Sequence, residues 1–348
     1  MVLPTMEVNL TRETICFDDV LLEPQYSDID SRTEVSLDSY LDWSLPFSLP
    51  VISSPMDTVT ETDMARAMSA AGGLGIIHRY NSIQEQVTMI EEALKGGARH
   101  VGAAVGVTGA FQARARQAIK AGAKIICIDI AHGHHSLMEM AIKGVRKEIG
   151  SAPVHLMAGN VATREAFDDL AKWGADSIRV GIGGGSICST RLVTGHGVPT
   201  FQSILDCSDT EYDAKIIADG GIKTTGDMVK AFAAGADFVM IGSMLAGVNE
   251  TPGDIFKDAD GKRYKVYRGM ASRAAQERWR GTATTPEGVS TTVPYKGTAA
   301  DILSNIKGGI CSGLSYSGAR NIEKFRFTAK FLKQTVAGSR ESNTHILS

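Results

Sequence analysis

Eight short apolar runs, rich in Val and Ile, recur along this sequence of 348 residues, and each run ends in small or polar residues. Apolar runs that are continuous rather than alternating are typical of strands buried on both faces, as in parallel sheets. The runs are Leu49–Ser53, Leu74–His78, His100–Val105, Lys124–Asp129, Val154–Gly159, Ser177–Ile182, Lys215–Gly220 and Phe238–Ser243. We therefore predict eight strands, each covered on both faces by other parts of the chain.

The intervals between the runs carry the apolar spacing of helices. The predicted helices are Glu61–Ala71, Ile83–Leu94, Ala110–Ala121, Ser136–Glu148, Arg164–Trp173 and Thr225–Ala234. Thr60 is suited to cap the first of them, because its hydroxyl can accept a hydrogen bond from the first turn. Several of the helices close on a glycine just before the next strand, where a left-handed residue is commonly needed. These glycines are Gly72, Gly122, Gly174 and Gly235.

Strand–helix units spaced mostly about 25 residues apart predict an α/β fold, a (β/α)8 or TIM barrel that occupies residues 1–348 as a single domain. A doubly wound sheet is the alternative, but it more often has fewer strands and a GxGxxG phrase after the first. Two connections are longer than the rest: residues 183–214 after the sixth strand and residues 244–297 after the eighth. Long loops on the carboxyl side of barrel strands usually form active sites. We expect an active-site loop in the first connection and a flap, at about residues 270–297, in the second.

The charge and cysteine content narrow the classes of partner. The net charge is −3 and no long basic run occurs, so nothing favours a nucleic-acid or membrane partner. The N-terminal segment lacks the apolar core of a secretory signal, and no apolar stretch approaches the length of a membrane span. The five cysteines are odd in number and none forms a CxxC pair, which disfavours a disulfide framework and a zinc site. We expect a cytoplasmic protein.

The predicted loop after the sixth strand begins Gly-Ile-Gly-Gly-Gly-Ser-Ile-Cys-Ser-Thr-Arg, residues 181–191. Glycines let the backbone turn its N–H and C=O groups toward a ligand. Cys188 in such a loop is a candidate nucleophile, because a reactive thiolate needs a polar and accessible environment. A free cysteine is more often a small buried apolar residue. We expect that for the other four, which are Cys16, Cys127, Cys207 and Cys311.

Small residues also end the seventh and eighth strands, as Asp219-Gly-Gly221 and Gly242-Ser243. Phosphate sites of (β/α)8 barrels commonly use these two loops together with a helix N-terminus. The alternative is that the glycines only allow tight packing of the strand ends. Asp219 would in the first case be able to accept hydrogen bonds from ribose hydroxyls.

Three histidines, His132, His134 and His135, follow the fourth strand and raise the alternative of a metal site. No third ligand at suitable spacing is evident, and no HExxH phrase occurs. Asp129, at the carboxyl end of the same strand, is the better functional candidate.

Nine phrases of the sequence match, in order, those of one enzyme family. They are Phe17–Pro24, Ser54–Glu61, Gly73–His78, Asp129–Gly133, Ala158–Thr163, Gly181–Arg191, Ala218–Ile222, Tyr267–Met270 and Pro294–Gly297. On these phrases the chain resembles the IMP dehydrogenase/GMP reductase family over nearly all of its length. So many ordered matches are far more specific than a single glycine motif.

The resemblance implies roles for individual residues. Cys188 would attack purine C2, and Thr190 and Glu287 would form a hydroxyl–carboxyl relay for ammonia release. The residues implied at the purine nucleotide are Ser54, Met56, Ser186, Asp219, Gly221, Gly242, Ser243, Tyr267, Gly269 and Met270. Those implied at the nicotinamide cofactor are Asp129, Asn160, Arg179 and Gly181. Carbonyls of Gly183, Gly185 and Cys188 would hold a monovalent cation such as K⁺. The resemblance also implies a homotetramer.

The family has two activities that share a covalent cysteine–purine intermediate. GMP reductase expels ammonia from GMP and then uses NADPH to give IMP, whereas IMP dehydrogenase passes hydride from IMP to NAD and hydrolyses the intermediate to XMP. Hydrolysis there relies on an Arg-Tyr pair on a long flap, for which the nearest match here is Arg278-Trp279 on a shorter flap. Trp cannot supply a phenol, and the regulatory insert of most dehydrogenases is missing. These features predict an NADPH-dependent GMP reductase.

Other features favour IMP dehydrogenase, with NAD as cofactor, as the alternative. The phrases Ser54-Pro-Met and Tyr267-Arg-Gly-Met look more like that enzyme, while Gly184 and Ser189 replace the more usual Pro and Thr near the implied cation site. A nucleotide-binding regulator without catalysis is a third interpretation. The intact set of Cys188, Thr190 and Glu287 argues against it.

Overall fold

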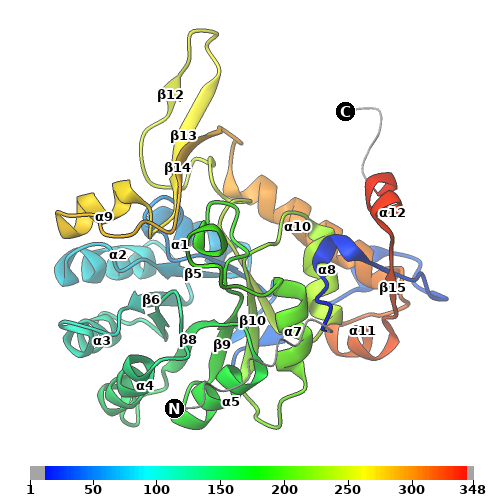
Figure 1. Ribbon diagram of the computed structural model, residues 1–348, viewed down its shortest axis with the longest axis horizontal. Coiled ribbons are helices and arrows are strands. Elements are labelled where there is room, and N and C mark those ends of the chain that lie inside the picture. The colour runs from blue at the N-terminus through cyan, green and yellow to red at the C-terminus, as the bar shows by residue number, and fades with distance from the viewer. Residues whose placement is uncertain (1–11, 343–348) are drawn as a thin grey trace, which may run out of the picture.

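The computed structural model describes residues 12–342, and its centre is a closed barrel of parallel strands (Figure 1). The strands are β4 (Val51–Ser53), β5 (Leu74–Ile77), β6 (Val101–Val105), β7 (Ile125–Asp129), β8 (His155–Val161), β9 (Ser177–Val180), β10 (Lys215–Asp219) and β11 (Phe238–Ile241). Each strand pairs with the next along the chain, and β11 pairs with β4 to close the barrel. The eight predicted strands and the (β/α)8 barrel are therefore confirmed.

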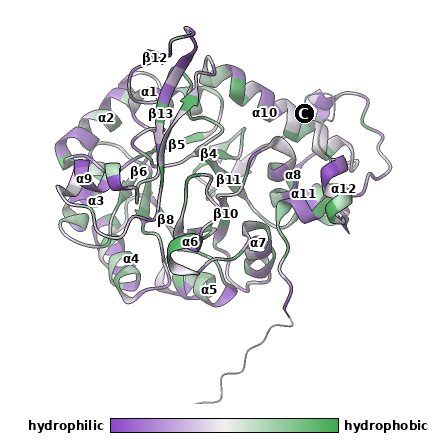
Figure 2. Ribbon diagram, turned by 45° about the horizontal axis from the view of Figure 1, so that its top comes forward, coloured by the Kyte–Doolittle hydropathy of each residue, from purple (hydrophilic) through white to green (hydrophobic). Residues whose placement is uncertain are grey.

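Helices surround the barrel and alternate with its strands. They are α1 (Thr62–Ala70), α2 (Ile83–Lys95), α3 (Phe111–Lys120), α4 (Ser136–Ile149), α5 (Arg164–Trp173), α7 (Thr200–Ser208), α8 (Thr225–Ala233) and α10 (Ala299–Ser315). Six of them are the predicted helices; α7 lies inside the long connection after β9, and α10 follows the flap. Figure 2 shows hydrophilic and hydrophobic residues alternating along α2, α3 and α4, as expected for amphipathic helices packed on a barrel.

The predicted cap of α1 is wrong. The residue at the N-cap position is Glu61, and it makes no side-chain cap hydrogen bond. The hydroxyl of Thr60 instead donates to the carbonyl oxygen of Ser54 at 2.7 Å and lies 2.8 Å from the hydroxyl of Ser53. Thr60 is fully buried beside the end of β4, so its hydroxyl is used to satisfy that strand end rather than the helix.

The predicted helix-ending glycines are confirmed. Gly72, Gly122, Gly174 and Gly235 have φ values of 85°, 103°, 114° and 116°, in the left-handed region that L-residues with a Cβ rarely adopt. At Gly72 the space is also closed, because a Cβ there would collide with the side chain of Ser48.

The interior of the barrel is filled by apolar side chains from its strands, among them Ile76, Cys127 and Met157. A hairpin of β2 (Ser39–Tyr40) and β3 (Pro46–Phe47) closes the amino end, where the rings of Phe47 and Phe238 meet edge to face at 5.6 Å. Each large side chain fully buried in this way contributes about 1.5–3 kcal/mol relative to an exposed one. The barrel is therefore packed solid at its amino end, and its open end is the carboxyl end of the strands.

Between β11 and α10 the chain leaves the barrel as a flap. It consists of an antiparallel sheet of β12 (Phe256–Lys257), β13 (Arg263–Arg268) and β14 (Ser290–Pro294), with α9 (Arg273–Arg280) between the last two strands. In Figure 1 this sheet projects away from the barrel. The excursion begins earlier than the predicted bounds of 270–297. The buried ammonium of Lys265 fixes its base by donating to the carbonyl oxygens of Val248 and Asn249 at 3.2 and 3.3 Å.

The two ends of the described chain meet beside the barrel, where β1 (Val20–Leu22) pairs antiparallel with β15 (Phe331–Lys333). The remaining short helices are η1 (Phe17–Asp19), η2 (Arg32–Glu34), α6 (Thr190–Thr194), α11 (Ile322–Thr328) and α12 (Val336–Glu341). No helix within residues 12–342 is both long enough and apolar enough to cross a membrane. Residues 1–11, part of the segment in which we expect no secretory signal, lie outside the described residues.

Candidate active site

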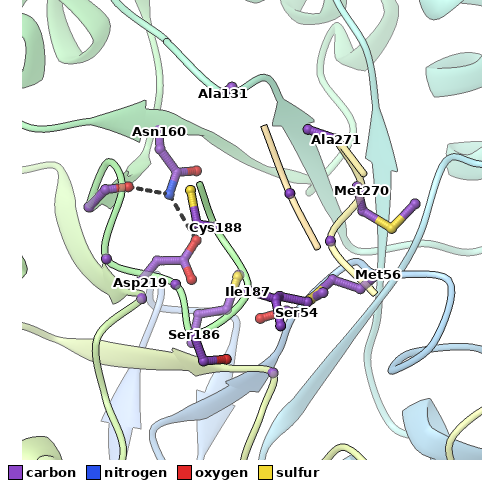
Figure 3. A pocket seen from close by; sticks show the side chains of 18 of the residues that line it. Ser54, Met56, Ala131, Asn160, Ser186, Ile187, Cys188, Asp219, Met270 and Ala271 are labelled. Carbon is purple, nitrogen blue, oxygen red and sulfur yellow. Dashed lines mark hydrogen bonds between the residues drawn. The ribbon is translucent and has the colours of Figure 1, made fainter. Parts of the chain in front are cut away.

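One cavity of about 300 Å³ lies at the carboxyl ends of the barrel strands, between the loop after β9 and the flap (Figure 3). Every site residue that the sequence predicts lines it. They are Ser54, Met56, Asp129, Asn160, Arg179, Gly181, Gly183, Gly185, Ser186, Cys188, Thr190, Asp219, Gly221, Gly242, Ser243, Tyr267, Gly269, Met270 and Glu287. The barrel thus brings together residues far apart in sequence, while the role of each remains a prediction.

Cys188 lies in this cavity with an exposed thiol. Its Sγ is 3.2 Å from Oγ1 of Thr190, and the Thr190 hydroxyl donates to Oε2 of Glu287 at 2.9 Å. Glu287 belongs to the flap, and its carbonyl oxygen accepts a hydrogen bond of 3.0 Å from the N–H of Ser189. The two long excursions are therefore joined beside the thiol. A continuous chain of hydrogen bonds leads from thiol to hydroxyl to carboxyl, along which a proton could move.

Two glycines explain the path of the loop that carries Cys188. Gly181 has a φ of 145°, and a Cβ there would collide with the carbonyl oxygen of Asp219. Gly183 has a φ of 80° and faces the side chain of Arg191. Because neither position tolerates a side chain, the loop can pass close against the end of β10 and turn the thiol into the cavity.

A buried arginine joins two of the predicted site carboxylates. Arg179 donates from Nη1 to Oδ1 of Asp129 at 2.6 Å, and from Nη2 to Oδ2 of Asp219 at 2.8 Å. Arg79 donates from Nε to the other oxygen of Asp129 at 3.2 Å. Burial alone raises the pKa of Asp129, but the charges of Arg179 and Arg79 outweigh it, so the pKa lies below its ordinary value. Asp129 is therefore a fixed negative charge at the floor of the cavity.

Asn160 and Asp219 form the opposite wall from Met56 and Met270 in Figure 3. The side-chain amide of Asn160 donates to the carbonyl oxygen of Gly181 and to Oδ2 of Asp219, both at 2.9 Å. The hydrogen bonds that Asp219 accepts among the described side chains all reach Oδ2. Its Oδ1 is thus left as an acceptor for a ligand hydroxyl, as the prediction for ribose requires.

The predicted phosphate end lies where β10 and β11 finish. Gly221 has a φ of 76°, which turns the chain sharply at the cavity wall. A Cβ on Gly242 would lie 3.2 Å from both Sδ of Met56 and the hydroxyl of Tyr267, so a ligand can approach this backbone closely only because the side chain is missing. Burial raises the pKa of Tyr267, and a hydrogen bond with Ser186 partly opposes that rise, so its hydroxyl stays a neutral donor at neutral pH.

The implied cation site has one carbonyl already engaged. The carbonyl oxygen of Gly185 accepts a hydrogen bond of 3.1 Å from the N–H of Cys188. A carbonyl oxygen has a second lone pair, so this hydrogen bond does not by itself prevent Gly185 from binding a cation.

A buried aspartate that the sequence reasoning missed anchors the flap. Asp57 follows the predicted residue Met56, and its carboxylate accepts hydrogen bonds of 3.1 and 3.0 Å from Nε of Arg268 and of 3.0 Å from Nε1 of Trp279. Its N–H also donates to Sδ of Met270 at 3.4 Å. The one sequence feature that could have identified Asp57 is its position within the Ser54–Glu61 phrase. Its partners are more than 200 residues away, and no local pattern reveals them.

Arg278, the nearest match to a dehydrogenase base, does not line the cavity. Its side chain is exposed, and its guanidinium lies 4.9 Å from the ring centroid of the adjacent Trp279. Trp279 in turn faces the barrel, where its ring lies 6.4 Å from that of His78.

The other candidates from the sequence, the histidines after β7 and the remaining four cysteines, do not line the cavity. His134 lies 2.9 Å from Asp169, and Nδ1 of His135 accepts the Leu137 N–H at the start of α4. No cluster of three or more potential metal ligands occurs in the described part of the chain. Cys127, Cys207 and Cys311 are buried and Cys16 is half-buried. Burial raises the pKa of Cys127 and of Cys207 to about 12, so these thiols remain protonated, as expected of inert cysteines.

Comparison with known proteins agrees with this geometry. Residues 14–345 match the family model described as the IMP dehydrogenase / GMP reductase domain. An inosine-5′-monophosphate dehydrogenase of Nitrosopumilus maritimus is 34% identical, over 96% of this chain and 98% of that protein. A GMP reductase of Leishmania major is 33% identical, over 99% and 98%. A GMP reductase variant of Trypanosoma brucei, solved in complex with guanosine 5′-monophosphate, superposes with a TM-score of 0.91 at 31% identity, over 96% of this chain and 98% of that one. This chain therefore belongs to the IMP dehydrogenase/GMP reductase family of nicotinamide-dependent oxidoreductases of purine nucleotides.

Proposed function

We propose that this protein is a GMP reductase, which converts GMP to IMP and ammonia with NADPH. One contrast carries the proposal: Glu287 is hydrogen-bonded through Thr190 to the Cys188 thiol in the cavity, whereas Arg278 lies exposed outside it. A reductase needs a proton donor beside the departing amine and no strong base for water. We also propose that it works as a homotetramer in the cytoplasm.

In the proposed reaction, the Cys188 thiolate attacks C2 of the purine and forms an S–C2 bond. The relay of Glu287 and Thr190 gives a proton to the amino group on C2, which leaves as ammonia. A bound reduced nicotinamide would supply the hydride that C2 needs. Cys188 then serves as the leaving group: the S–C2 bond breaks and its electron pair returns to sulfur. GMP, NADPH and two protons thereby give IMP, NADP⁺ and ammonium.

The residues proposed to hold the two substrates are those that the family resemblance implies, and all of them line the cavity. Asp219 would accept the ribose hydroxyls through Oδ1, and Gly221, Gly242 and Ser243 would surround the phosphate with backbone N–H groups. Asp129, Asn160, Arg179 and Gly181 would face the nicotinamide. Asp129, which is itself paired with two guanidiniums, would keep Arg179 and Arg79 in place beside that ring.

IMP dehydrogenase with NAD is the alternative. Relatives of both names match nearly the whole chain at similar identity, so similarity does not separate the two activities. The missing insert does not separate them either. The alignment with the Leishmania major GMP reductase runs over 490 positions, against 348 residues in this chain, so a reductase can also carry the extra segment. The proposal therefore rests on the flap and on the exposed position of its Arg278.

The identity of the reaction product tests the proposal that the protein is a GMP reductase. Purified protein is incubated with GMP and NADPH, and separately with IMP and NAD, and the nucleotides are separated by chromatography. We expect IMP and ammonia from the first mixture and little XMP from the second. Robust XMP formation, lost in Arg278→Ala, would overturn the proposal in favour of IMP dehydrogenase. No turnover in either direction, with GMP still bound, would indicate a nucleotide-binding regulator.

A further inference from the structure

A short loop, residues 281–286, joins helix α9 to Glu287, the proposed proton donor. Among the described residues, no backbone group from Thr282 to Pro286 forms a hydrogen bond with another backbone group. The loop therefore lacks the regular bonds that fix a helix or a strand. Its conformation, and with it the direction in which the chain reaches Glu287, must depend on side chains.

The side chain of Gln276 supplies bonds to this loop. Gln276 lies on α9 and is almost completely buried. Its side-chain oxygen accepts the N–H of Thr284 at 2.9 Å and the hydroxyl of Thr284 at 3.3 Å. Its side-chain nitrogen donates to the carbonyl oxygen of Ala271 at 3.0 Å, with a weaker contact of 3.5 Å to that of Thr285. One amide thus uses both its donor and its acceptor, and it holds the loop at two consecutive residues.

The carbonyl oxygen of Ala271 links Gln276 to Glu287. It accepts two hydrogen bonds, one from the Gln276 side chain and one from the N–H of Glu287, both at 3.0 Å. Ala271 lines the cavity next to Met270 (Figure 3). Gln276 therefore contacts both the acceptor to which the backbone of Glu287 is bound and the loop that leads to it.

We propose that Gln276 is a positioning residue for the Glu287 carboxylate. Gln276 does not line the cavity, so it would act only through Glu287. The inference rests on the proposed function in one respect, that Glu287 passes a proton through Thr190. That transfer needs Oε2 of Glu287 to stay within hydrogen-bond reach of the Thr190 hydroxyl, from which it lies 2.9 Å away. A misplacement of about 1 Å in a catalytic group can slow a reaction about a hundredfold.

Gln276→Leu removes these hydrogen bonds and keeps a buried side chain of similar size. With GMP and NADPH we expect kcat to fall at least tenfold, while KM for GMP changes less than twofold, because no contact with the nucleotide is lost. The control is Gln334→Leu, which removes an amide that donates to the carbonyl oxygen of Asp18 at 2.8 Å, beside β15 and away from the flap (Figure 1). Its kcat should stay within twofold of wild type.

A double-mutant cycle separates positioning of Glu287 from a general loosening of the flap. In a Glu287→Gln background the carboxylate is already gone, so Gln276→Leu should lower the remaining kcat less than twofold. A further loss as large as that in the wild-type background would show that Gln276 acts on the fold and not through Glu287, and would overturn the proposal. An unchanged kcat in Gln276→Leu alone would overturn it as well.

Gln276→Glu keeps the test decisive if thermal unfolding shows that the leucine variant is unstable. A protonated carboxyl group can still donate to Ala271 and accept from Thr284, whereas the ionised form cannot donate. Burial raises the pKa of such a carboxyl group, so both forms are accessible near neutral pH. The ratio of the variant's kcat to that of wild type should therefore be largest in mild acid and fall as the pH rises. A ratio that is independent of pH would contradict the role of the donated bond.

The cycle can be run in either direction of the family's chemistry. If wild type makes XMP from IMP and does not reduce GMP, the proposed function fails, and the same four proteins are compared with IMP and NAD. Non-additive losses would then keep the positioning role, whereas additive losses, or no effect of Glu287→Gln, would overturn it. If wild type and Gln276→Leu reduce GMP equally fast, only the positioning role fails. No turnover with either pair of substrates would overturn both.

Discussion

Trp279 is bound to Asp57 by a hydrogen bond of 3.0 Å from the indole nitrogen to Oδ2, which ties helix α9 of the flap to the loop after β4. The carboxylate is almost completely buried and also receives the guanidinium of Arg268 at the end of β13. One carboxylate thus holds both ends of the segment that carries Arg278. The exposed position of Arg278 is a consequence of this anchor, since the ring beside it faces the barrel.

Trp279→Phe is expected to loosen the flap without unfolding the barrel. The substitution keeps an aromatic ring but removes the donor, at a cost of about 0.5–1.5 kcal/mol for the lost hydrogen bond. Tryptic cleavage within α9 should become several-fold faster. The control is Trp173→Phe on α5, which removes an indole far from the flap and should leave the cleavage rate unchanged. Equal acceleration in both variants would contradict the anchor.

Iodoacetamide should alkylate Cys188 before the other cysteines. Its thiol is exposed, whereas burial raises the pKa of Cys127 and Cys207 to about 12, so that at pH 8 only about one buried thiol in ten thousand is ionised. Activity should fall in step with labelling, as peptide mass spectrometry can follow, and GMP should protect. Cys188→Ala should be inactive, folded and resistant to labelling. More than about a tenth of wild-type activity in that variant would rule out covalent catalysis at this residue.

Glu287→Gln should slow the deamination of GMP by a factor of about 10²–10⁴, the usual contribution of a general acid or base. The amide preserves the shape and the contact with Thr190 but cannot pass a proton. Arg278→Ala should have a much smaller effect, because the side chain lies outside the cavity. Steady-state kinetics with GMP and NADPH, supported by thermal unfolding of each variant, test the pair. A larger defect in Arg278→Ala would point to the dehydrogenase mechanism.

Guanosine should bind far more weakly than GMP. The phosphate is proposed to accept hydrogen bonds from backbone N–H groups at Gly221 and Gly242, and hydrogen bonds to a charged group contribute about 1.5–3 kcal/mol each. A loss of at least a hundredfold in affinity is expected by calorimetry. Equal affinities for the two ligands would remove the phosphate site from the ends of β10 and β11.

Asp129→Asn should destabilise the protein at neutral pH and less so in acid. The folded pKa of Asp129 lies below its ordinary value of 3.8, so the stability that its ionised form contributes is complete above that value and is lost as the pH falls below it. Removing one partner of a buried pair typically costs about 3–5 kcal/mol. Urea unfolding at pH 7 and at pH 3 would show the difference between wild type and variant shrinking. A difference that stays constant would mean that Asp129 is not held ionised by Arg179 and Arg79.

The order of strands and helices followed from the sequence because it depends on local patterns. Continuous apolar runs predicted all eight barrel strands, and helix spacing predicted α5 at its observed bounds, Arg164–Trp173. Once the strands are parallel and the barrel is closed, their carboxyl ends must meet. Residues as distant as Asp129, Cys188 and Gly242 could therefore be expected in one cavity without knowledge of any contact.

Tertiary structure alone decided which side chains meet. Thr60 belongs to the residue types that favour helix N-caps, but burial beside β4 directs its hydroxyl to Ser54. Asp57 and Trp279 are 222 residues apart, and their hydrogen bond depends on how the flap packs on the barrel. In the sequence Arg114 resembles any exposed helix charge, and only the fold places its guanidinium against Asn81 and Gln86. Local propensity acts over a few residues, whereas these contacts are set by the closure of the barrel and the packing of the flap against it.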